Sequence, residues 1–311
     1  MFWWVAAALA GPNATVTSEA MGGNLRIIVR CESAFWHSDC LSDGVAARSE
    51  VERIEAWATD WRKESTIGAL NETGNGELPE EIVNLLTIST ELNRATHGAF
   101  DVTVGGLWHL WGFDPPRIPT EAQRLEAVAS VRGEEVRVEG NQVFLPTHSQ
   151  ITLGGIAQGY AASAALARIP KKRAAMVDVS GDIAVRGRWT IGIQHPRADR
   201  GLAFAQVGLR NAVLSTSGDY EHYFEADGQR YHHILDPKTG LPAYGAISAT
   251  VVHPDGALAD ALATALIVLG PDEAVVSSAG AWALVVTPDL QIHELGRRGK
   301  HVTSVLRPDH L

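Results

Sequence analysis

The sequence is poor in cysteine and has no excess of positive charge. Its 311 residues include two cysteines, and 26 lysines and arginines stand against 36 aspartates and glutamates, which gives a formal net charge of −10 at pH 7. No basic stripe is present to neutralise a phosphate backbone, so the composition argues against a nucleic-acid partner. The short basic run at residues 171–173 predicts a solvated loop. No internal repeat or low-complexity segment separates a second domain.

Long hydrophobic runs are also missing, so no transmembrane segment is expected. The apolar residues 2–11 are too few to span a bilayer and lack the basic segment that precedes the core of a signal peptide. No cysteine follows them, as a lipid-attachment site would require. They are either a fragment of a signal sequence or part of an extension packed on the fold. We favour the second interpretation and assign residues 1–16 to such an extension.

The two cysteines leave the compartment open. Cys31 and Cys40 lie close together in the sequence, and a disulfide between them would fit an exported protein. Two free thiols are equally allowed, and those would fit the cytoplasm. The sequence therefore assigns the protein to neither compartment.

What is present fits one large enzyme domain of the α+β class. Hydrophobic residues make up 45% and charged residues 20%, which are ordinary globular values. Apolar periodicity predicts helices over residues 45–61, 80–96 and 158–169. Strands are predicted over residues 25–29, 135–145, 174–179, 190–194, 203–209, 212–215, 246–252 and 282–286. Because successive strands are separated by turns, we expect antiparallel sheets flanked by helices.

The segment at residues 231–242 (YHHILDPKTGLP) places two histidines directly before an Asp-Pro turn. Histidine has the side-chain pKa closest to neutrality, so an imidazole held at the end of a strand is a candidate general base. Pro237 fixes one φ angle, Gly240 allows a positive φ, and Asp236 can hydrogen-bond the turn backbone. The pattern therefore predicts a rigid turn next to a basic side chain.

A polar pair lies in the otherwise apolar residues 259–270, which predict a helix that ends at Gly270 and Pro271. Asp260 and Thr264 are its only polar side chains, and their spacing puts them on one face. In one interpretation Asp260 caps the helix and Thr264 bonds back to a carbonyl. In the other they bind a metal, because carboxylate and hydroxyl oxygens suit Mg²⁺ completed by water and phosphate.

Both segments belong to a series of motifs that resembles the FAD:protein FMN transferase family, known as ApbE. The resemblance covers about residues 17–295 and begins with Met21 and Gly22 at an N-terminal strand. The other motifs are TDWRKESTIGALN at residues 59–71, GAFDVTVG at 98–105, LWGF at 110–113, LGGIAQGYA at 153–161, VSGDI at 179–183, GIQHP at 192–196 and STSGDY at 215–220. Each motif is weak alone, and their common order and spacing carry the resemblance.

The resemblance implies a metal site and a base. Gly155 would give its backbone carbonyl to Mg²⁺ together with Asp260 and Thr264. From the residues alone, the glycine pair before a helix suits a phosphate or carbonyl contact, but a simple tight turn is the alternative. His233 matches the histidine of the family, three residues before the aspartate of the turn. In a strand, His232 would point to the opposite face.

The resemblance also implies a set of FAD contacts. Trp61 stands where the family has an aromatic residue that stacks on the flavin, although an interior aromatic is the common alternative. Met21 would contact the ring system. The remaining implied contacts are Ala99, Phe100, Asp101, Thr152, Gln158 and Ile234. Thr152 and Gln158 depart from the family, which commonly has charged residues at these positions, and the sequence does not tell how this departure affects FAD affinity or specificity.

The implied reaction is transfer of the FMN moiety of FAD to a serine or threonine hydroxyl of an acceptor flavoprotein. AMP would leave, His233 would accept the hydroxyl proton, and Mg²⁺ would neutralise the phosphate charge. Two alternatives are a Mg²⁺-dependent pyrophosphatase that splits FAD into FMN and AMP, and a flavin-binding carrier without catalysis. The sequence does not identify the acceptor or the oligomeric state.

Overall fold

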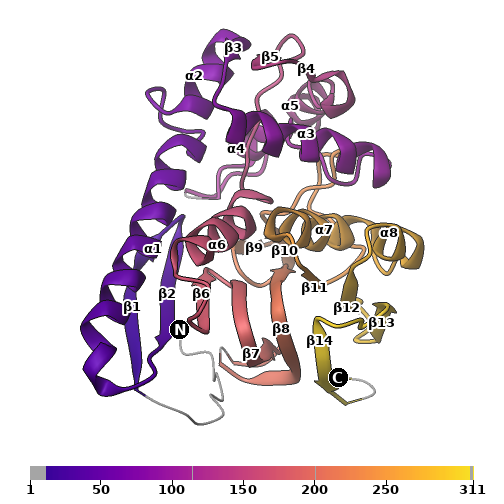
Figure 1. Cartoon of the computed structure of the whole chain (residues 1–311). Helices are drawn as coiled ribbons and strands as arrows, with labels where there is room; N and C mark the ends of the chain where they lie inside the picture. The colour runs from indigo at the N-terminus through magenta and orange to yellow at the C-terminus, as the bar shows by residue number, and fades with distance from the viewer. Residues whose placement is uncertain (1–11, 114, 200, 309–310) are drawn as a thin grey trace.

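The fold is built on one large antiparallel sheet with helices stacked above it. A computed structural model describes residues 12–113, 115–199, 201–308 and 311. Figure 1 shows the sheet in the lower part of the molecule, with α6 (Ala157–Arg168) and α7 (Gly256–Leu269) across its upper end and α1 (His37–Ala58) along one side. A second group of helices, from α2 (Thr66–Thr73) to α5 (Glu121–Val128), lies above α6 and α7. The α+β prediction is therefore confirmed.

The large sheet has nine strands in the order β1-β2-β6-β7-β8-β11-β12-β13, and β14 pairs with β8. All its pairings are antiparallel. The strands are β1 (Asn13–Ala20), β2 (Gly23–Arg30), β6 (Ala175–Val179), β7 (Asp182–Gln194), β8 (Ala203–Gly218), β11 (Ser248–His253), β12 (Trp282–Val286), β13 (Ile292–Gly296) and β14 (Val302–Leu306).

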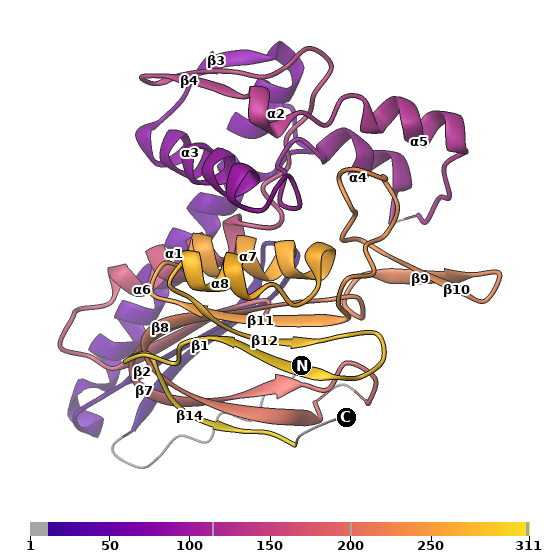
Figure 2. The same cartoon turned by 90° about the vertical axis from the view of Figure 1, so that its right-hand side faces the viewer.

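Two smaller sheets accompany the large one. One has the order β3-β5-β4 and the other is the hairpin of β9 and β10. Figure 2 shows this hairpin projecting from the body beneath α4. The short strands are β3 (Asn75–Glu77), β4 (Arg137–Glu139), β5 (Gln142–Phe144), β9 (Tyr223–Ala226) and β10 (Gln229–His232).

The helices lie in two layers above one face of the large sheet, and α1 runs along its side (Figure 1). They are η1 (Ala34–Trp36), α1 (His37–Ala58), α2 (Thr66–Thr73), α3 (Glu80–Ala95), α4 (Gly105–Trp111), α5 (Glu121–Val128), η2 (Gly133–Glu135), α6 (Ala157–Arg168), α7 (Gly256–Leu269) and α8 (Glu273–Ser278). Helix α7 packs on β8 and β11 below, on α6 beside it and on α3 above (Figure 2). Contact on several sides explains why its sequence is apolar nearly all round.

The core has two parts, one on each face of the large sheet. Ile27 and Val29 of β2 belong to the cluster beneath the helices, whereas Ile28 belongs to a second cluster with Trp189 and Trp282. Successive side chains of a strand point to opposite faces, so both faces of β2 are buried. This burial fixes the register of the strands that lead to the candidate site.

Several element boundaries differ from the sequence-based predictions. The predicted strand over residues 135–145 is wrong, because Gly140 (φ 61°) turns the chain between β4 and β5. The segments at 203–209 and 212–215 form the single strand β8. The N-cap of α7 is Asp255, whose side chain accepts hydrogen bonds from Ala257 N (2.9 Å) and Leu258 N (3.3 Å). The interpretation of Asp260 as a cap is therefore wrong.

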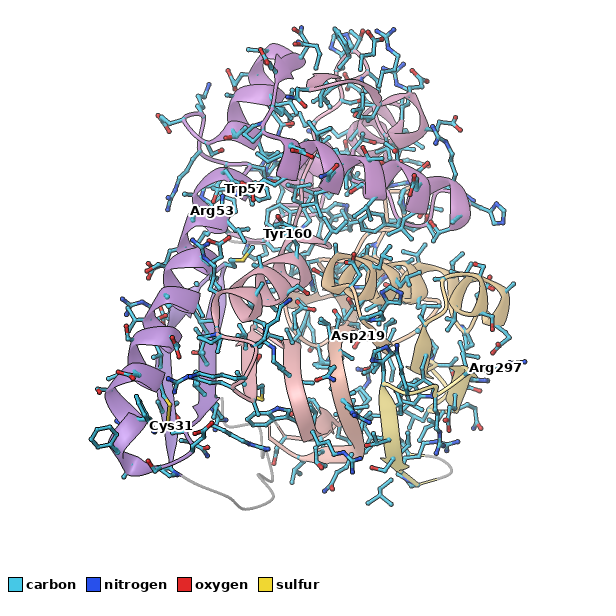
Figure 3. All side chains as sticks on the ribbon, in the orientation of Figure 1. Cys31, Arg53, Trp57, Tyr160, Asp219 and Arg297 are labelled. Carbon is cyan, nitrogen blue, oxygen red and sulfur yellow. A yellow bond between two sulfur atoms is a disulfide. The ribbon has the colours of Figure 1, made fainter. Side chains whose placement is uncertain are left out.

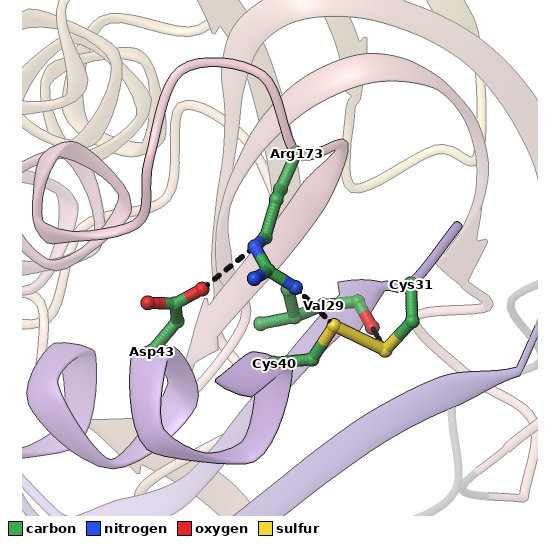
Figure 4. Close-up of a disulfide and its surroundings, with 5 residues drawn as sticks. All are labelled: Val29, Cys31, Cys40, Asp43 and Arg173. Atoms are coloured by element: carbon green, nitrogen blue, oxygen red, sulfur yellow. Dashed lines mark hydrogen bonds and ion pairs between the residues drawn. A yellow bond between two sulfur atoms is a disulfide. The ribbon is translucent and has the colours of Figure 1, made fainter. Parts of the chain in front are cut away.

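The structure joins Cys31 and Cys40 in a disulfide, with Cα atoms 6.2 Å apart (Figure 4). The bridge ties the end of β2 to the first turn of α1. The guanidinium of Arg173 contacts Cys40 Sγ and pairs with Asp43 at 2.8 Å. Of residues 1–16, which the sequence interpretation assigned to an extension, residues 1–11 lie outside the described residues, whereas residues 13–16 belong to β1 of the large sheet. In the part of the chain that the structure describes, no helix is long and apolar enough to cross a membrane.

Candidate active site

The three residues implied as metal ligands come together where α6 meets α7. Asp260 is buried in the first half of α7, and its carboxylate accepts the Gly159 N–H at 3.0 Å. Thr264 lies one turn further on, with Oγ1 3.3 Å from Ser217 Oγ of β8. Gly155 approaches so closely that a Cβ on it would lie 3.1 Å from Thr264 Oγ1. Thr264 therefore faces a neighbouring strand and Gly155.

The carboxylates here are buried with little charge compensation. Desolvation by burial raises the pKa of Asp260 to about 7, although backbone hydrogen bonds from Gly159 and Gln158 oppose the shift. Burial, and next the charge of Asp260, raise the pKa of Asp182 on β7 well above its usual range. The Ser215 hydroxyl donates to Asp182. A cation at this place would relieve the cost of the buried negative charge.

The donor set suits Mg²⁺ better than a softer metal. A carboxylate, a hydroxyl and a backbone carbonyl are hard oxygen ligands, and Mg²⁺ keeps room for water and substrate phosphate. In the described ranges, no cluster of three or more His, Cys, Asp or Glu side chains could hold a metal ion. A site here would therefore depend on ligands from a phosphate as well as from the protein. Asp182 lies in the VSGDI motif at residues 179–183 but was not among the predicted site residues, because no local pattern places it beside Asp260.

The raised pKa of Asp260 makes the stability of the metal-free protein depend on pH. The folded-state pKa of about 7 lies above the unfolded value of about 3.9. The folded state therefore holds the proton more tightly, and this contribution to stability is lost as the pH rises from about 4 to 7. We expect thermal unfolding of metal-free wild type to move to lower temperature over this range relative to Asp260→Asn. If the melting temperatures of the two proteins changed with pH by the same amount, the pKa assignment would be contradicted.

Two glycines allow α6 and α7 to cross in contact. A Cβ on Gly159 would overlap the Gly256 carbonyl oxygen, and a Cβ on Gly256 would overlap the Gly159 carbonyl oxygen. The close approach brings the Gly159 N–H against Asp260. The crossing therefore holds the carboxylate in a fixed place.

Gly159→Ala should separate the two helices and lower the free energy of unfolding by about 1–3 kcal/mol, the usual scale of overpacking. Gly154→Ala is the matched control, because the nearest atom to its Cβ would be Thr152 Oγ1 at 3.6 Å. Chemical denaturation of both variants measures the difference. Equal stability of the two would show that the crossing tolerates a methyl group.

The two histidines at the end of β10 have different surroundings. His232 is fully buried, with Nε2 2.7 Å from the Ala243 carbonyl oxygen. His233 is partly accessible, and its ring meets His222 and Phe113 edge-on, with centroids 5.3 and 6.5 Å apart. His232 is therefore tied to the protein interior, whereas His233 stands beside two other rings. Neither His222 nor Phe113 was among the predicted site residues.

The tautomer of His233 follows from its backbone contact. Nδ1 lies 3.2 Å from the His222 carbonyl oxygen, so Nδ1 carries the proton and donates it. The lone pair is then on Nε2. Burial, and next the neighbouring His222, lower the pKa of His233 to about 3. The imidazole is therefore neutral at pH 7 and can accept a proton at Nε2.

The predicted rigid turn after His233 is confirmed. Asp236 Oδ1 accepts the Lys238 N–H at 2.9 Å, and Oδ2 accepts the Thr239 hydroxyl at 3.0 Å. Gly240 has φ 69°. Its carbonyl accepts the Trp111 indole N–H at 2.8 Å. The turn is thus fixed both within itself and against α4.

Met21 occupies the turn between β1 and β2 and is held from both sides. It has φ 52°, which is strained for a residue with a side chain. Its N–H donates to Glu55 Oε1 at 2.9 Å, and its carbonyl accepts Gln158 Nε2 at 2.9 Å. Gln158, an implied FAD contact, thus uses its amide nitrogen to position Met21. Glu55 was not among the predicted site residues, because its partner is the backbone N–H of Met21, which is distant in sequence.

Trp61 lies in the loop between α1 and α2 with 65% of its surface exposed. The interpretation as an interior aromatic is therefore wrong. Its ring is accessible to stack against a planar ligand.

Trp61→Ala should weaken FAD binding by about 1–3 kcal/mol, on the scale of a base stacked on an aromatic side chain. Because Trp61 is largely exposed, thermal stability should stay nearly constant. Trp36→Ala, at an exposed tryptophan in η1, is the control. Titration with FAD distinguishes them, and equal affinities would remove Trp61 from the site.

The loop after α3 places Phe100 near the candidate metal site. The Phe100 ring would lie 3.5 Å from a Cβ on Gly155. Asp101 is buried, and its carboxylate accepts from Thr103 N (2.7 Å), Thr103 Oγ1 (2.5 Å), Asn93 Nδ2 (3.0 Å) and Gly133 N (3.0 Å). The carboxylate of Asp101 therefore holds the loop together. A nucleotide contact in this segment would use its backbone.

The other implied FAD contacts also have protein partners. Thr152 N donates to the Val102 carbonyl at 2.8 Å, which joins the segment before α6 to the Phe100 loop. Thr152 Oγ1 accepts the Gly154 N–H at 3.4 Å. Ile234 is buried and its carbonyl accepts the Ala243 N–H at 3.0 Å.

A cavity of about 280 Å³ lies between α3 and α6. Tyr160 donates to Glu81 Oε2 at 3.2 Å along its wall, and Glu81 also pairs with Arg53 at 2.5 Å. Figure 3 shows Arg53, Trp57 and Tyr160 together at the upper end of α1. A second cavity of about 390 Å³ lies beside β10, next to the Arg197–Asp219 ion pair. Neither His233 nor Asp260 lines either cavity.

Comparison with known proteins identifies the family. The model of the ApbE family matches residues 21–281. An FAD:protein FMN transferase of Haemophilus influenzae is 34% identical over 274 residues, covering 77% of this chain and 79% of the relative. One of Klebsiella pneumoniae is 30% identical over 249 residues, covering 73% and 71%.

Solved structures agree with the sequence comparison. The ApbE protein of Thermotoga maritima superposes with a TM-score of 0.84 at 31% identity, over 91% of this chain and 97% of the other. The flavin transferase ApbE of Vibrio cholerae superposes with a TM-score of 0.80 at 26% identity, over 91% and 97%. Fold, motif order and sequence identity therefore agree that the chain belongs to the ApbE family.

Proposed function

We propose that the chain is an FAD:protein FMN transferase that attaches FMN to a serine or threonine hydroxyl of an acceptor flavoprotein. The observation that carries the proposal is the buried Asp260 carboxylate, held by backbone amides next to Thr264 and Gly155. This arrangement provides oxygen ligands and uncompensated negative charge. The named activity of the relatives supplies the reaction.

The proposed metal role follows from the donor set. Mg²⁺ bound by Asp260, Thr264 and the Gly155 carbonyl would neutralise the pyrophosphate of FAD and the charge that develops during transfer. Asp260 supplies the formal charge among these three ligands, and the Gly159 N–H orients its carboxylate. Because the Asp260 carboxylate is buried, its electrostatic attraction for a bound cation would be strong.

The transfer forms one bond to phosphorus and breaks another. The acceptor hydroxyl oxygen bonds to the phosphorus of the FMN moiety, and the bond from that phosphorus to the bridging oxygen breaks. The bridging oxygen leaves with AMP. The hydroxyl proton goes to His233 Nε2, whose lone pair is available because Nδ1 donates to the His222 carbonyl.

The low pKa of His233 in the free protein suits this role once FAD is bound. A neutral imidazole is ready to accept a proton, but a pKa of about 3 makes it a weak base. A pyrophosphate nearby stabilises the protonated form and raises the pKa. Substrate binding therefore strengthens the base at the moment it is needed.

The remaining residues position the flavin. The exposed face of Trp61 would stack on the ring system, with Met21 held beside it by Glu55 and Gln158. Gln158 and Thr152 contribute no charge, so FAD binding would depend on stacking and hydrogen bonds. The acceptor segment would have to reach His233 beside the projecting hairpin of β9 and β10.

Incubation of the protein with FAD, Mg²⁺ and candidate acceptor subunits tests the proposal. Intact mass spectrometry follows the acceptor and chromatography follows AMP. A transferase adds the mass of FMN, less one water, to the acceptor and releases AMP. AMP without a change in acceptor mass would indicate a pyrophosphatase, and neither product would indicate a flavin-binding carrier.

A further inference from the structure

The hairpin of β9 and β10 projects from the body as a sheet of two strands (Figure 2). Its register is set by the two-residue turn of Asp227 and Gly228, whose φ angles of 52° and 76° are those of a type I′ turn. Within the described residues, β9 pairs with no strand other than β10. The hairpin therefore has two outer edges, and each presents unpaired backbone groups unless another segment covers it.

The unpaired backbone groups of β9 belong to Tyr223 and Glu225. Facing residues of an antiparallel pair alternate between pairs that exchange two hydrogen bonds and pairs that exchange none. His222 and His233 form a pair of the first kind, since the His233 N–H donates to the His222 carbonyl at 3.0 Å. Tyr223 and Glu225, one and three positions further along, therefore belong to pairs of the second kind. Their N–H and C=O groups point away from β10.

The outer edge of β10 is already covered by the chain that follows the Asp236 turn. The Tyr244 hydroxyl donates to the Arg230 carbonyl at 3.3 Å, and the Ala243 N–H donates to the Ile234 carbonyl at 3.0 Å. A further strand could pair there only by displacing these contacts. The outer edge of β9 is therefore the one that is open to an added strand.

The hairpin is rigid enough to act as a template. Phe224 of β9 and Tyr231 of β10 stack with ring centroids 5.2 Å apart and planes at 16°. On the same face, Phe113 meets Phe224 at 6.0 Å and Trp111 of α4 meets Tyr231 at 5.5 Å. An isolated two-stranded hairpin is marginally stable, but this packing supports it. Pairing with a preformed edge therefore costs the hairpin little conformational entropy.

The open edge of β9 leads to the candidate base. Strand β9 begins at Tyr223, directly after His222, whose ring meets that of His233 edge-on at 5.3 Å. Neighbouring strands lie about 4.8 Å apart, so a segment paired with β9 would lie about 10 Å from β10. A residue just beyond the paired stretch, at the His222 end, can cross this gap with its chain and bring a hydroxyl to His233.

The reaction indicates what occupies the edge. The relatives transfer FMN to a protein, so a polypeptide with a serine or threonine must lie beside His233 while FAD is bound. An extended segment that adds to a sheet edge gains affinity from main-chain hydrogen bonds and leaves its flanking residues free. The open edge beside the base provides such bonds, through Tyr223 and Glu225.

We propose that the acceptor segment binds as an added strand on the outer edge of β9. Its backbone pairs with Tyr223 and Glu225, and its serine or threonine follows the paired stretch and lies at His233. The inference rests on the proposed transferase function, because it names the surface that receives the acceptor of that reaction. It assigns β9 to acceptor binding alone, so FAD affinity is independent of this edge.

Glu225→Pro tests the inference, because proline removes the outward N–H and is tolerated on an edge strand where that N–H faces solvent. We expect KM for the acceptor to rise about tenfold, since one hydrogen bond is lost and the acceptor carbonyl stays unpaired. FAD affinity and kcat at saturating acceptor should stay close to wild type. The lost ion pair of Glu225 with Arg230 contributes little, because the carboxylate side chain is 63% exposed.

Glu77→Pro is the matched control on the edge strand β3 of another sheet. Glu77 is exposed, and its N–H also points outward, since Gly74 O and Leu78 N on either side bond to the neighbouring hairpin. Its acceptor KM should equal that of wild type. FAD titration of both proline variants reports correct folding.

A second measurement uses the wild-type protein and therefore does not depend on the folding of a variant. Synthetic peptides with the target segment of the acceptor each carry one N-methyl amide, and transfer to each peptide gives its KM. Because a strand directs every second N–H to the same neighbour, KM should rise at alternate residues of the paired stretch.

A higher acceptor KM for Glu225→Pro alone, with alternation along the peptide, supports the inference. Equal acceptor KM for wild type and Glu225→Pro, or a peptide series without alternation, would overturn it and leave the proposed function intact. A wild type that labels no acceptor would overturn both. A wild-type dimer that Glu225→Pro abolishes without a change in acceptor KM would overturn it and assign the edge to pairing between two copies.

Discussion

Asp260→Ala should abolish Mg²⁺-dependent transfer while the protein stays folded. The substitution removes the one charged ligand among the three proposed, so Mg²⁺ binding should become undetectable by calorimetry. The fold should persist, because the deleted carboxylate is buried without a cationic side-chain partner and its pKa is raised. Asp260→Asn is the sharper variant, because it keeps an oxygen for the Gly159 N–H.

The two Asp260 variants separate charge from packing. If the charge matters, Asn and Ala both lose metal binding and turnover. If packing matters, Asn keeps both. Full transfer by the alanine variant in EDTA would remove the metal from the proposed mechanism.

His233→Ala should slow transfer by about 10²–10⁴, the usual contribution of a general base. FAD affinity should change little, since the imidazole acts on the acceptor hydroxyl. With a pKa of about 3 in the free protein, His233 should cause no change in kcat/KM for FAD between pH 5 and 8, because this constant reports the protein before FAD binds.

His232→Ala is the control for the neighbouring position. It removes the bond to the Ala243 carbonyl and should cost about 1–3 kcal/mol of stability, with transfer near wild-type rates at low temperature. An inactive His232 variant and an active His233 variant would reverse the assignment. That result would mean that the strand presents the other face to the substrate.

The sequence predicts those parts of the fold that depend on local pattern. The apolar period over residues 80–96 predicts a helix, and α3 spans Glu80–Ala95. The turn chemistry of Asp236, Pro237 and Gly240 likewise gives the observed turn, because its hydrogen bonds are local. The spacing of Asp260 and Thr264 predicts a shared face; in the structure Asp260 contacts Gly159 of α6 and Thr264 contacts Ser217 of β8.

The sequence does not predict contacts between distant segments. Glu55 and Gln158 meet at the backbone of Met21, and no local pattern marks such a contact. The pairing of Asp182 with Asp260 depends on how α7 lies over the sheet. The prediction of short strands is wrong for a related reason. Residues 135–145 have the composition of one strand, but a single glycine with positive φ divides them into two.

The ratio of AMP to flavinylated acceptor tests the central claim most directly. Wild type should release one AMP for each acceptor that gains FMN, and the acceptor should gain nothing when its target hydroxyl is replaced by alanine. EDTA and Asp260→Asn should stop both products together. AMP released in excess of acceptor labelling, or labelling that persists in EDTA, would contradict a metal-dependent FMN transferase.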